Sequence, residues 1–377
     1  MPTVLVPITG SVLAWAIGEA GLSNAEVASQ LGVSQSQIAD WIAGTAHPSK
    51  TKFDQLRKLL DRPESVFFLA SPPPSSSSAT RFRSHASRTG PHTPTPEDLK
   101  AIKLAQNLQR VMRWLGEDRR VLEIPRASIG DPPEAVAEEA RAWLGWSTRE
   151  QIKAKDHEVA KLLRARIEQR GIIALNLTLS DGGFRGFSLP DSIAPVIAIN
   201  TRDDIRARSF SYIHECGHLM LGIESICDAS PASGTDTWCD NVAAAFLMPR
   251  PVLADYMLRK FHVQEVDSLE EVRWAANQLN VSYRAMARRF ESLGMGVPGL
   301  YGKINKLISN QSRGGGVGGP PQTRARRKLQ RYGAGFVGRL MAAEEEGELE
   351  NADLVDLLNL SRAELKELRG LLNEGAE

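Results

Sequence analysis

The run Phe210-Ser-Tyr-Ile-His-Glu-Cys-Gly-His-Leu-Met-Leu-Gly222 contains two histidines four residues apart. Residues at that spacing share one face of an α-helix, so His214 and His218 are expected to project together and to bind one metal ion. An apolar stripe with intervals of three and four residues favours the helix. Its members are Phe210, Ile213, Gly217 and Met220. We therefore expect a helix that is buried beside its metal-binding face.

Glu215 follows the first histidine and is expected to lie beside the open coordination position, where it can accept a proton from water. Two histidines with an adjacent glutamate form the zinc site and general base that metallopeptidases use. Glu215 is therefore the predicted catalytic residue, and Zn²⁺ is the predicted cofactor. The alternative is that both histidines are ordinary polar residues beside the apolar stripe. Peptide hydrolysis also needs a residue that stabilises the oxyanion formed when water attacks the carbonyl. That residue is not assigned; Arg185, Tyr212 and His262 are candidates.

A second helix is predicted from Asp236 to a stop at Pro249. Asp236 and Asp240 lie one turn apart on this helix. We prefer Asp236 as the third ligand that a catalytic zinc needs, with Asp240 holding a ligating imidazole from behind. The small residues of Ala243-Ala244-Ala245 would let this helix approach the first one closely.

Two alternatives to this assignment stay open. Both aspartates would also suit a helix N-terminus, where negative charge is favoured. Glu224 is a rival ligand, because it lies ten residues after His214, as in another zinc-peptidase spacing. Leu221, however, stands where that spacing has glycine.

The motif His214-Glu-Cys-Gly-His218, followed by a helix that ends Ala-Ala-Ala-Phe-Leu-Met-Pro249, resembles the ImmA/IrrE metallo-endopeptidases. Gly186-Phe-Ser-Leu189 and Pro195-Val-Ile-Ala-Ile-Asn200 resemble the same family. The resemblance covers roughly residues 10 to 300 and includes an N-terminal helix-turn-helix of the XRE repressor type. It implies a peptidase that cuts or controls a DNA-bound repressor. The family usually has glutamate where this chain has Asp236, which implies closer helices or weaker metal binding.

The composition is that of a globular protein, with 42% hydrophobic and 24% charged residues among 377. The expected fold class is mainly α with a small β-sheet, an α+β zincin-like peptidase domain between an all-α N-terminal domain and a helical C-terminal region. About three strands are expected, at 172–180, 184–189 and 195–200. The expected domains are a helix-turn-helix domain (1–72), a flexible linker (73–96), a metallopeptidase domain with a helical extension (97–310), a Gly/Pro linker (311–323) and a helical region (324–377).

A short helix, a turn at Gly32 and a helix capped by Ser34 form the helix-turn-helix pattern. Its base-facing residues would be Gln35, Ser36 and Gln37. Residues 1–72, however, hold five Lys or Arg and six Asp or Glu, a net charge of −1. Because phosphate contacts supply most non-specific affinity, this domain alone should bind DNA weakly, and the whole chain or a homodimer more tightly. A helical domain that binds protein is the alternative.

The pattern of helix, turn and Ser-capped helix occurs twice more, with turns at Leu279-Asn-Val-Ser282 and Leu358-Asn-Leu-Ser361. Short helix pairs are common, so these repeats indicate further DNA readers only weakly. A basic cluster that could hold phosphate comprises Arg324, Arg326, Arg327, Lys328 and Arg331. The tail from 344 to 377 has eleven acids and three bases. We expect the cluster and the tail to neutralise each other.

The sequence also indicates a compartment. Its apolar runs fall short of the ~20 residues of a membrane span, and the first residues lack the features of a signal peptide. Three cysteines are few and odd in number, which favours a reducing environment. We therefore expect a cytoplasmic protein without a membrane partner.

These observations predict a zinc-dependent endopeptidase coupled to a DNA-binding domain. Its protein substrate would be a transcriptional regulator, which it cleaves or controls in a stress or mobile-element response. The alternative is a non-hydrolytic transcriptional regulator, or an antitoxin that masks a partner toxin with the same domains. An intact Glu215 favours the enzyme, because a purely structural metal site needs no base.

Overall fold

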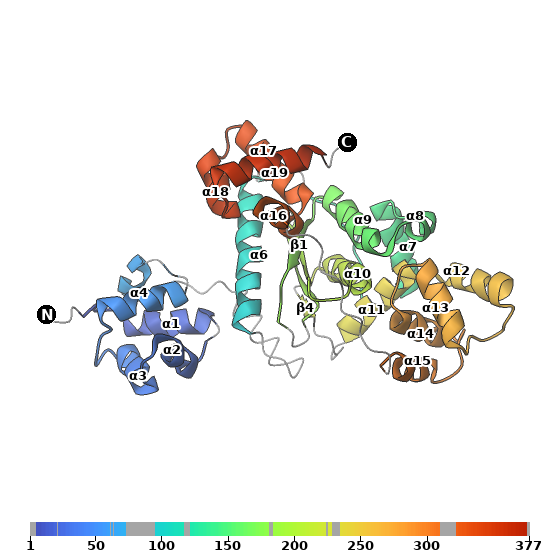
Figure 1. Cartoon of the computed structure of the whole chain (residues 1–377), viewed down its shortest axis with the longest axis horizontal. Coiled ribbons are helices and arrows are strands. Elements are labelled where there is room, and N and C mark those ends of the chain that lie inside the picture. Colours follow the sequence, from blue (N-terminus) through green and yellow to red (C-terminus); the bar gives the residue numbers. More distant parts are fainter. Residues whose placement is uncertain are drawn as a thin grey trace. The chain divides into compact units, whose positions relative to one another are not determined.

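The computed structural model describes residues 5–20, 22–60, 62, 64–72, 95–116, 121–180, 184–223, 225–227, 234–309 and 322–374. The chain forms two compact units, Met1–Leu104 and Ala105–Glu377 (Figure 1). The predicted linkers at 73–96 and 311–323 lie almost wholly outside the described residues. The predicted domain boundaries remain predictions.

The regular elements of the first unit, within its described residues, are helices, apart from one isolated antiparallel bridge between Leu5 and Ser49. It contains α1 (Gly10–Ala20), α2 (Asn24–Leu31), α3 (Gln35–Ala43), α4 (Lys50–Leu59), η1 (Glu64–Phe68) and the first part of α6 (Pro96–Trp114). Ser23 and Ser34 begin α2 and α3 with reciprocal capping boxes. Gly32 ends α2 in the left-handed conformation, which glycine adopts without strain. The predicted helix, turn and Ser-capped helix are therefore present.

A four-stranded sheet lies in the second unit. Its strands are β1 (Ile173–Leu177), β2 (Gly186–Leu189), β3 (Val196–Asn200) and β4 (Ser225–Cys227), in the order β1-β3-β2-β4. β1 pairs with β3 in parallel, whereas β2 pairs with β3 and β4 antiparallel. The fold class of helices with a small sheet is confirmed. The three predicted strands are present, and β4 is an additional one.

A run of helices lies mainly to one side of the sheet (Figure 1). They are α7 (Pro133–Leu144), α8 (Thr148–Lys153), α9 (Asp156–Gln169), α10 (Ile205–Leu221), α11 (Gly234–Leu247), α12 (Arg250–Asp255), η2 (Tyr256–Phe261), α13 (Leu269–Gln278), α14 (Tyr283–Ser292) and α15 (Leu300–Ser309). One apolar core joins residues of α7, α9, α10 and α11 with inward-facing residues of β1 and β3. On α6, Gln109 donates to the main-chain oxygens of Leu189 and Ala194, each at 3.0 Å. In this core, the helix α10, which carries His214 and His218, lies between the sheet and α11.

The second helix pair of the repeated pattern, α13 and α14, has the predicted turn. Asn280 adopts the left-handed conformation, and Ser282 caps α14. The arginines of α14 make contacts within the unit, because Arg289 is buried against Glu134 at 2.7 Å and Arg288 stacks on Tyr301. These arginines therefore join α14 to α7 and to α15.

The last four helices, α16 (Arg324–Tyr332), α17 (Ala334–Glu345), α18 (Asn351–Leu358) and α19 (Arg362–Glu374), belong to the same unit. A nearly buried ion pair on α9, Arg164 with Glu168 at 2.9 Å, anchors them. Arg164 donates to the main-chain oxygens at the end of α16, and Glu168 accepts from the amide of Gly335 at 2.9 Å. Gly333 has φ 88°, and any side chain there would collide with Glu168.

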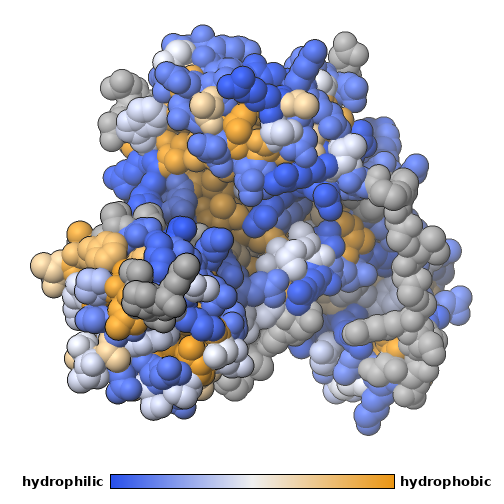
Figure 2. Space-filling model, turned by 60° about the vertical axis from the view of Figure 1, so that its left-hand side comes forward, coloured by the Kyte–Doolittle hydropathy of each residue, from blue (hydrophilic) through white to orange (hydrophobic). Residues whose placement is uncertain are grey.

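The side chains on the face shown in Figure 2 are mostly hydrophilic, with apolar ones in scattered groups. Within the described part of the chain, no helix is both long and apolar enough to cross a membrane.

Candidate metal centre

His214 and His218 lie on α10, which Asp204 caps at its start and Gly222 ends in the left-handed conformation. As predicted, the two side chains share one face, with their Nε2 atoms 3.1 Å apart. The residues are 7% and 1% exposed, respectively. Burying a polar ring costs free energy unless the ring has a binding partner. The burial of two adjacent imidazoles therefore points to a functional site.

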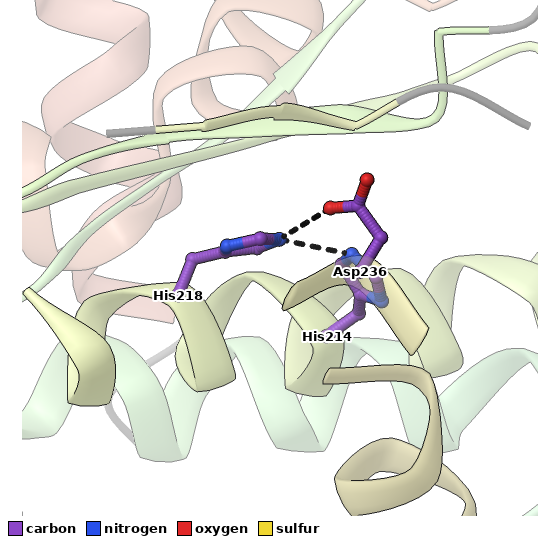
Figure 3. A group of neighbouring side chains, drawn as sticks. All are labelled: His214, His218 and Asp236. Carbon is purple, nitrogen blue, oxygen red and sulfur yellow. Dashed lines mark hydrogen bonds and ion pairs between the residues drawn. The ribbon is translucent and has the colours of Figure 1, made fainter. Parts of the chain in front are cut away.

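Asp236 from α11 meets this pair. Its Oδ1 lies 3.3 Å from His218 Nε2. One ligand atom from each of His214, His218 and Asp236 falls within 4.8 Å of the others, and Figure 3 shows the three side chains converging from two helices. Two imidazole nitrogens and one carboxylate oxygen are a donor set typical of a catalytic zinc site, so these residues fit the metal.

The helices α10 and α11 approach each other closely beside these three residues. A Cβ added to Gly217 would lie 3.1 Å from Cys239 Sγ, so the two helices touch at this glycine. The shorter aspartate therefore reaches the histidines from a nearby backbone. Glu224, the rival ligand, lies outside the described residues.

Asp240 contacts the second ring nitrogen of His214. Its Oδ1 lies 2.9 Å from His214 Nδ1. A carboxylate in this place favours the tautomer with Nδ1 protonated, which would leave Nε2 available to bind a metal. The contact is the one expected if Asp240 orients His214, and that role stays a prediction.

We expect Asp240→Ala to weaken metal affinity by about 10- to 100-fold, because His214 loses the acceptor that orients its ring. Asp240→Asn keeps an acceptor oxygen and is the matched control, which should retain most of the affinity. Competition titration against a metal-binding dye measures both variants. Wild-type affinity in Asp240→Ala would contradict the orienting role.

Glu215 is 1% exposed and lies between the metal helix and the sheet. A Cβ added to Gly186 on β2 would lie 2.8 Å from Glu215 Oε1 and 2.7 Å from the main-chain oxygen of Ala198. Only glycine therefore fits at position 186 while Glu215 keeps its place. This contact was not predicted. Its signal was a glycine inside a strand, which often marks a close approach.

The two cysteines near the centre are buried. Burial raises the pKa of both the Cys216 and Cys239 thiols, so they stay protonated and fill the helix interface.

Tyr212 donates to Asn176 at 2.8 Å, and burial raises its pKa to about 12. Tyr212 is therefore a poor candidate for the oxyanion. Arg185 and His262 are exposed.

Gln35, Ser36 and Gln37 are exposed in the first turn of α3, where a reading helix would present them. Gln37 Oε1 accepts from the Ser34 amide at 3.0 Å, so its carbonyl serves the helix cap. Ser36 Oγ lies 2.8 Å from Ser34 Oγ. Of the three, Gln35 is the best placed to contact a base; their role in DNA recognition stays a prediction.

Two family models match the chain. Residues 168–291 match the IrrE N-terminal-like domain, and residues 13–67 match a helix-turn-helix. The first match runs from the end of α9 into α14 and includes both helices of the metal centre. A comparison with curated proteins gave no match. The predicted resemblance to ImmA/IrrE-type proteins with an N-terminal helix-turn-helix is confirmed.

Proposed function

We propose that this chain, in which an IrrE-like metallopeptidase domain follows a helix-turn-helix domain, is a zinc-dependent endopeptidase that cleaves a regulatory protein. The observation that carries the proposal is the position of Glu215. Its buried carboxylate stands next to His214 and against Gly186. A site that used metal only for stability would have no need of a base there.

The proposed reaction is hydrolysis of a peptide bond. Zinc held by His214, His218 and Asp236 would activate water and polarise the scissile carbonyl. Glu215 accepts a proton from the attacking water and donates it to the leaving amine, acting first as general base and then as general acid. The neighbouring β2 backbone at Gly186 keeps the Glu215 carboxylate against the sheet.

The sheet has two edges, and they differ. At the β1 edge, α16 packs on the strand, and Arg164 Nε donates to the main-chain oxygen of Ala174 at 2.9 Å. The side chain of Asn176 also donates to Gln330 O at 3.3 Å. β1 is therefore closed to another strand.

The opposite edge is β4. Among the described residues, no strand pairs with its outer side. Cys227 of β4 is in register with Gly186, the residue in contact with Glu215, so this edge lies one strand away from the catalytic carboxylate. An extended peptide can add to such an edge through main-chain hydrogen bonds. We infer that the substrate chain binds along β4.

A regulator is the proposed substrate because the peptidase domain is joined to a DNA-binding domain. Such a fusion would bring the metal centre to proteins that sit on DNA. In the competing function, a transcriptional regulator or antitoxin, the same chain would bind its partner without cutting it.

Removal of the metal tests the proposal. Purified protein added to a lysate of cells that lack it should generate new protein N-termini, which mass spectrometry detects. A chelator should abolish them, and zinc should restore them, because the reaction depends on the three ligands. New N-termini that persist in the chelator would exclude a metallopeptidase. Their absence under every condition would favour the non-hydrolytic regulator.

A further inference from the structure

Five cations lie within the nine residues of α16, and that helix contains no acid. Four of them occur at intervals of three and four residues, so they share one face of the helix: Arg324, Arg327, Lys328 and Arg331. We call these four residues the α16 stripe. The buried residues Ala325 and Tyr332 lie on another side and fix α16 to the unit. Within the stripe, Arg324 and Arg327 are exposed, whereas Lys328 and Arg331 are half-buried.

The acidic tail neutralises this stripe only in part. Arg324 lies 3.7 Å from Glu364, and both side chains are partly exposed. Elsewhere the tail pairs with itself, as Arg369 does with Glu344 at 2.7 Å. In the part of the chain that the structure describes, no ion pair involves Arg327 or Arg331. Among the described residues, the expected mutual neutralisation thus amounts to one long ion pair, between Arg324 and Glu364.

The field around the stripe is correspondingly positive. The pKa of Lys328 is lowered, first by partial burial and then by the nearby charges of Arg331 and Arg324. Glu364 acts in the opposite direction without reversing the shift. A ligand that brings negative charge would relieve this repulsion.

The helix-turn-helix unit, in contrast, has no excess of positive charge. Residues 1–72 carry a net charge of −1, and α3 holds Asp40 but no cation. Base contacts specify a site, but phosphate contacts supply most of the affinity. A chain that binds DNA through this unit needs phosphate contacts from another element.

We propose that the α16 stripe binds the phosphate backbone of DNA and supplies electrostatic affinity that the helix-turn-helix unit lacks. Arginine suits this role, because its guanidinium can hold a phosphate with two parallel hydrogen bonds. The inference rests on the DNA-binding part of the proposed function and is independent of peptide hydrolysis.

The test compares the salt dependence of binding by full-length protein to a random-sequence DNA duplex. Arg324→Gln with Arg327→Gln removes two exposed charges of the stripe. The slope of log affinity against log salt should become shallower by about two, roughly one for each lost phosphate contact. Glu364→Gln, which removes the acid that pairs with Arg324, should tighten binding.

A matched control removes two exposed charges elsewhere in the same unit, Arg259→Gln with Lys260→Gln on η2, and should leave the slope unchanged. If the control and the stripe variant lose the same amount of slope, the effect depends on net charge alone, and the proposal is overturned. An unchanged slope in the stripe variant would also overturn it and would leave an acidic protein as the partner. Zinc content and cleavage, measured on the same variants, report separately on the peptidase function.

Discussion

Replacing Glu215 by glutamine is expected to abolish most peptide hydrolysis while the fold and the metal content stay unchanged. Glu215 is next to a ligand but is not one of the three residues that converge on the site. The amide of glutamine is close in size to the carboxylate, so the contact with Gly186 should survive. It cannot accept a proton from water, and loss of a general base typically costs a factor of about 10² to 10⁴ in rate.

The measurement compares cleavage products from Glu215→Gln and wild-type protein at equal concentration. Zinc content and circular dichroism are recorded alongside. A second readout is a transcriptional reporter under the control of the chain. If Glu215→Gln cleaves as fast as the wild type, Glu215 is not the base. If neither protein cleaves and both control the reporter equally, the chain acts as a regulator that binds without hydrolysis.

The second large effect concerns the ligands themselves. His214→Ala combined with His218→Ala should remove zinc from the purified protein, where the wild type is expected to hold about one ion per chain. Two of the three converging donors disappear, and the remaining carboxylate alone binds zinc weakly. Elemental analysis of protein prepared without added metal gives the stoichiometry. An unchanged zinc content in the double variant would place the metal elsewhere.

The same measurement decides the third ligand. Asp236→Ala should lose most of the metal affinity, because its carboxylate lies 3.3 Å from His218 Nε2. Glu224→Ala is the matched control, since it removes the rival acid by the same substitution. The opposite pattern would transfer the ligand role to Glu224.

The metal helix was predictable because its information is local. The spacing of His214 and His218 and the apolar stripe beside them are properties of one turn after another along a single helix. The position of Asp236 followed from the same periodicity on a second helix. The close approach of α11 to α10 depends on the contact between Gly217 and Cys239. The spacing of residues along one helix does not encode such a contact between two helices.

The parts that could not be predicted depend on contacts between distant residues. The strand β4 is only three residues long, Ser225–Cys227, and it exists because β2 provides a partner. Likewise, the charge of α16 is visible in the sequence, but its place on the sheet depends on Arg164 and Glu168. These two residues lie more than 150 positions earlier in the chain. Local pattern alone cannot report such pairings.

The β4 edge, which pairs with no further strand among the described residues, has a consequence for the proteins that the chain would cut under the proposed function. Such an edge accepts a peptide only when that peptide is already extended. A folded regulator offers an extended segment only while part of it is transiently unfolded, so its cleavage rate follows the free energy of that local opening. Any ligand that raises this free energy by about 1.4 kcal/mol would slow cleavage about tenfold without contacting the peptidase. Under the proposed function, the stability of the substrate itself sets the time at which it is destroyed.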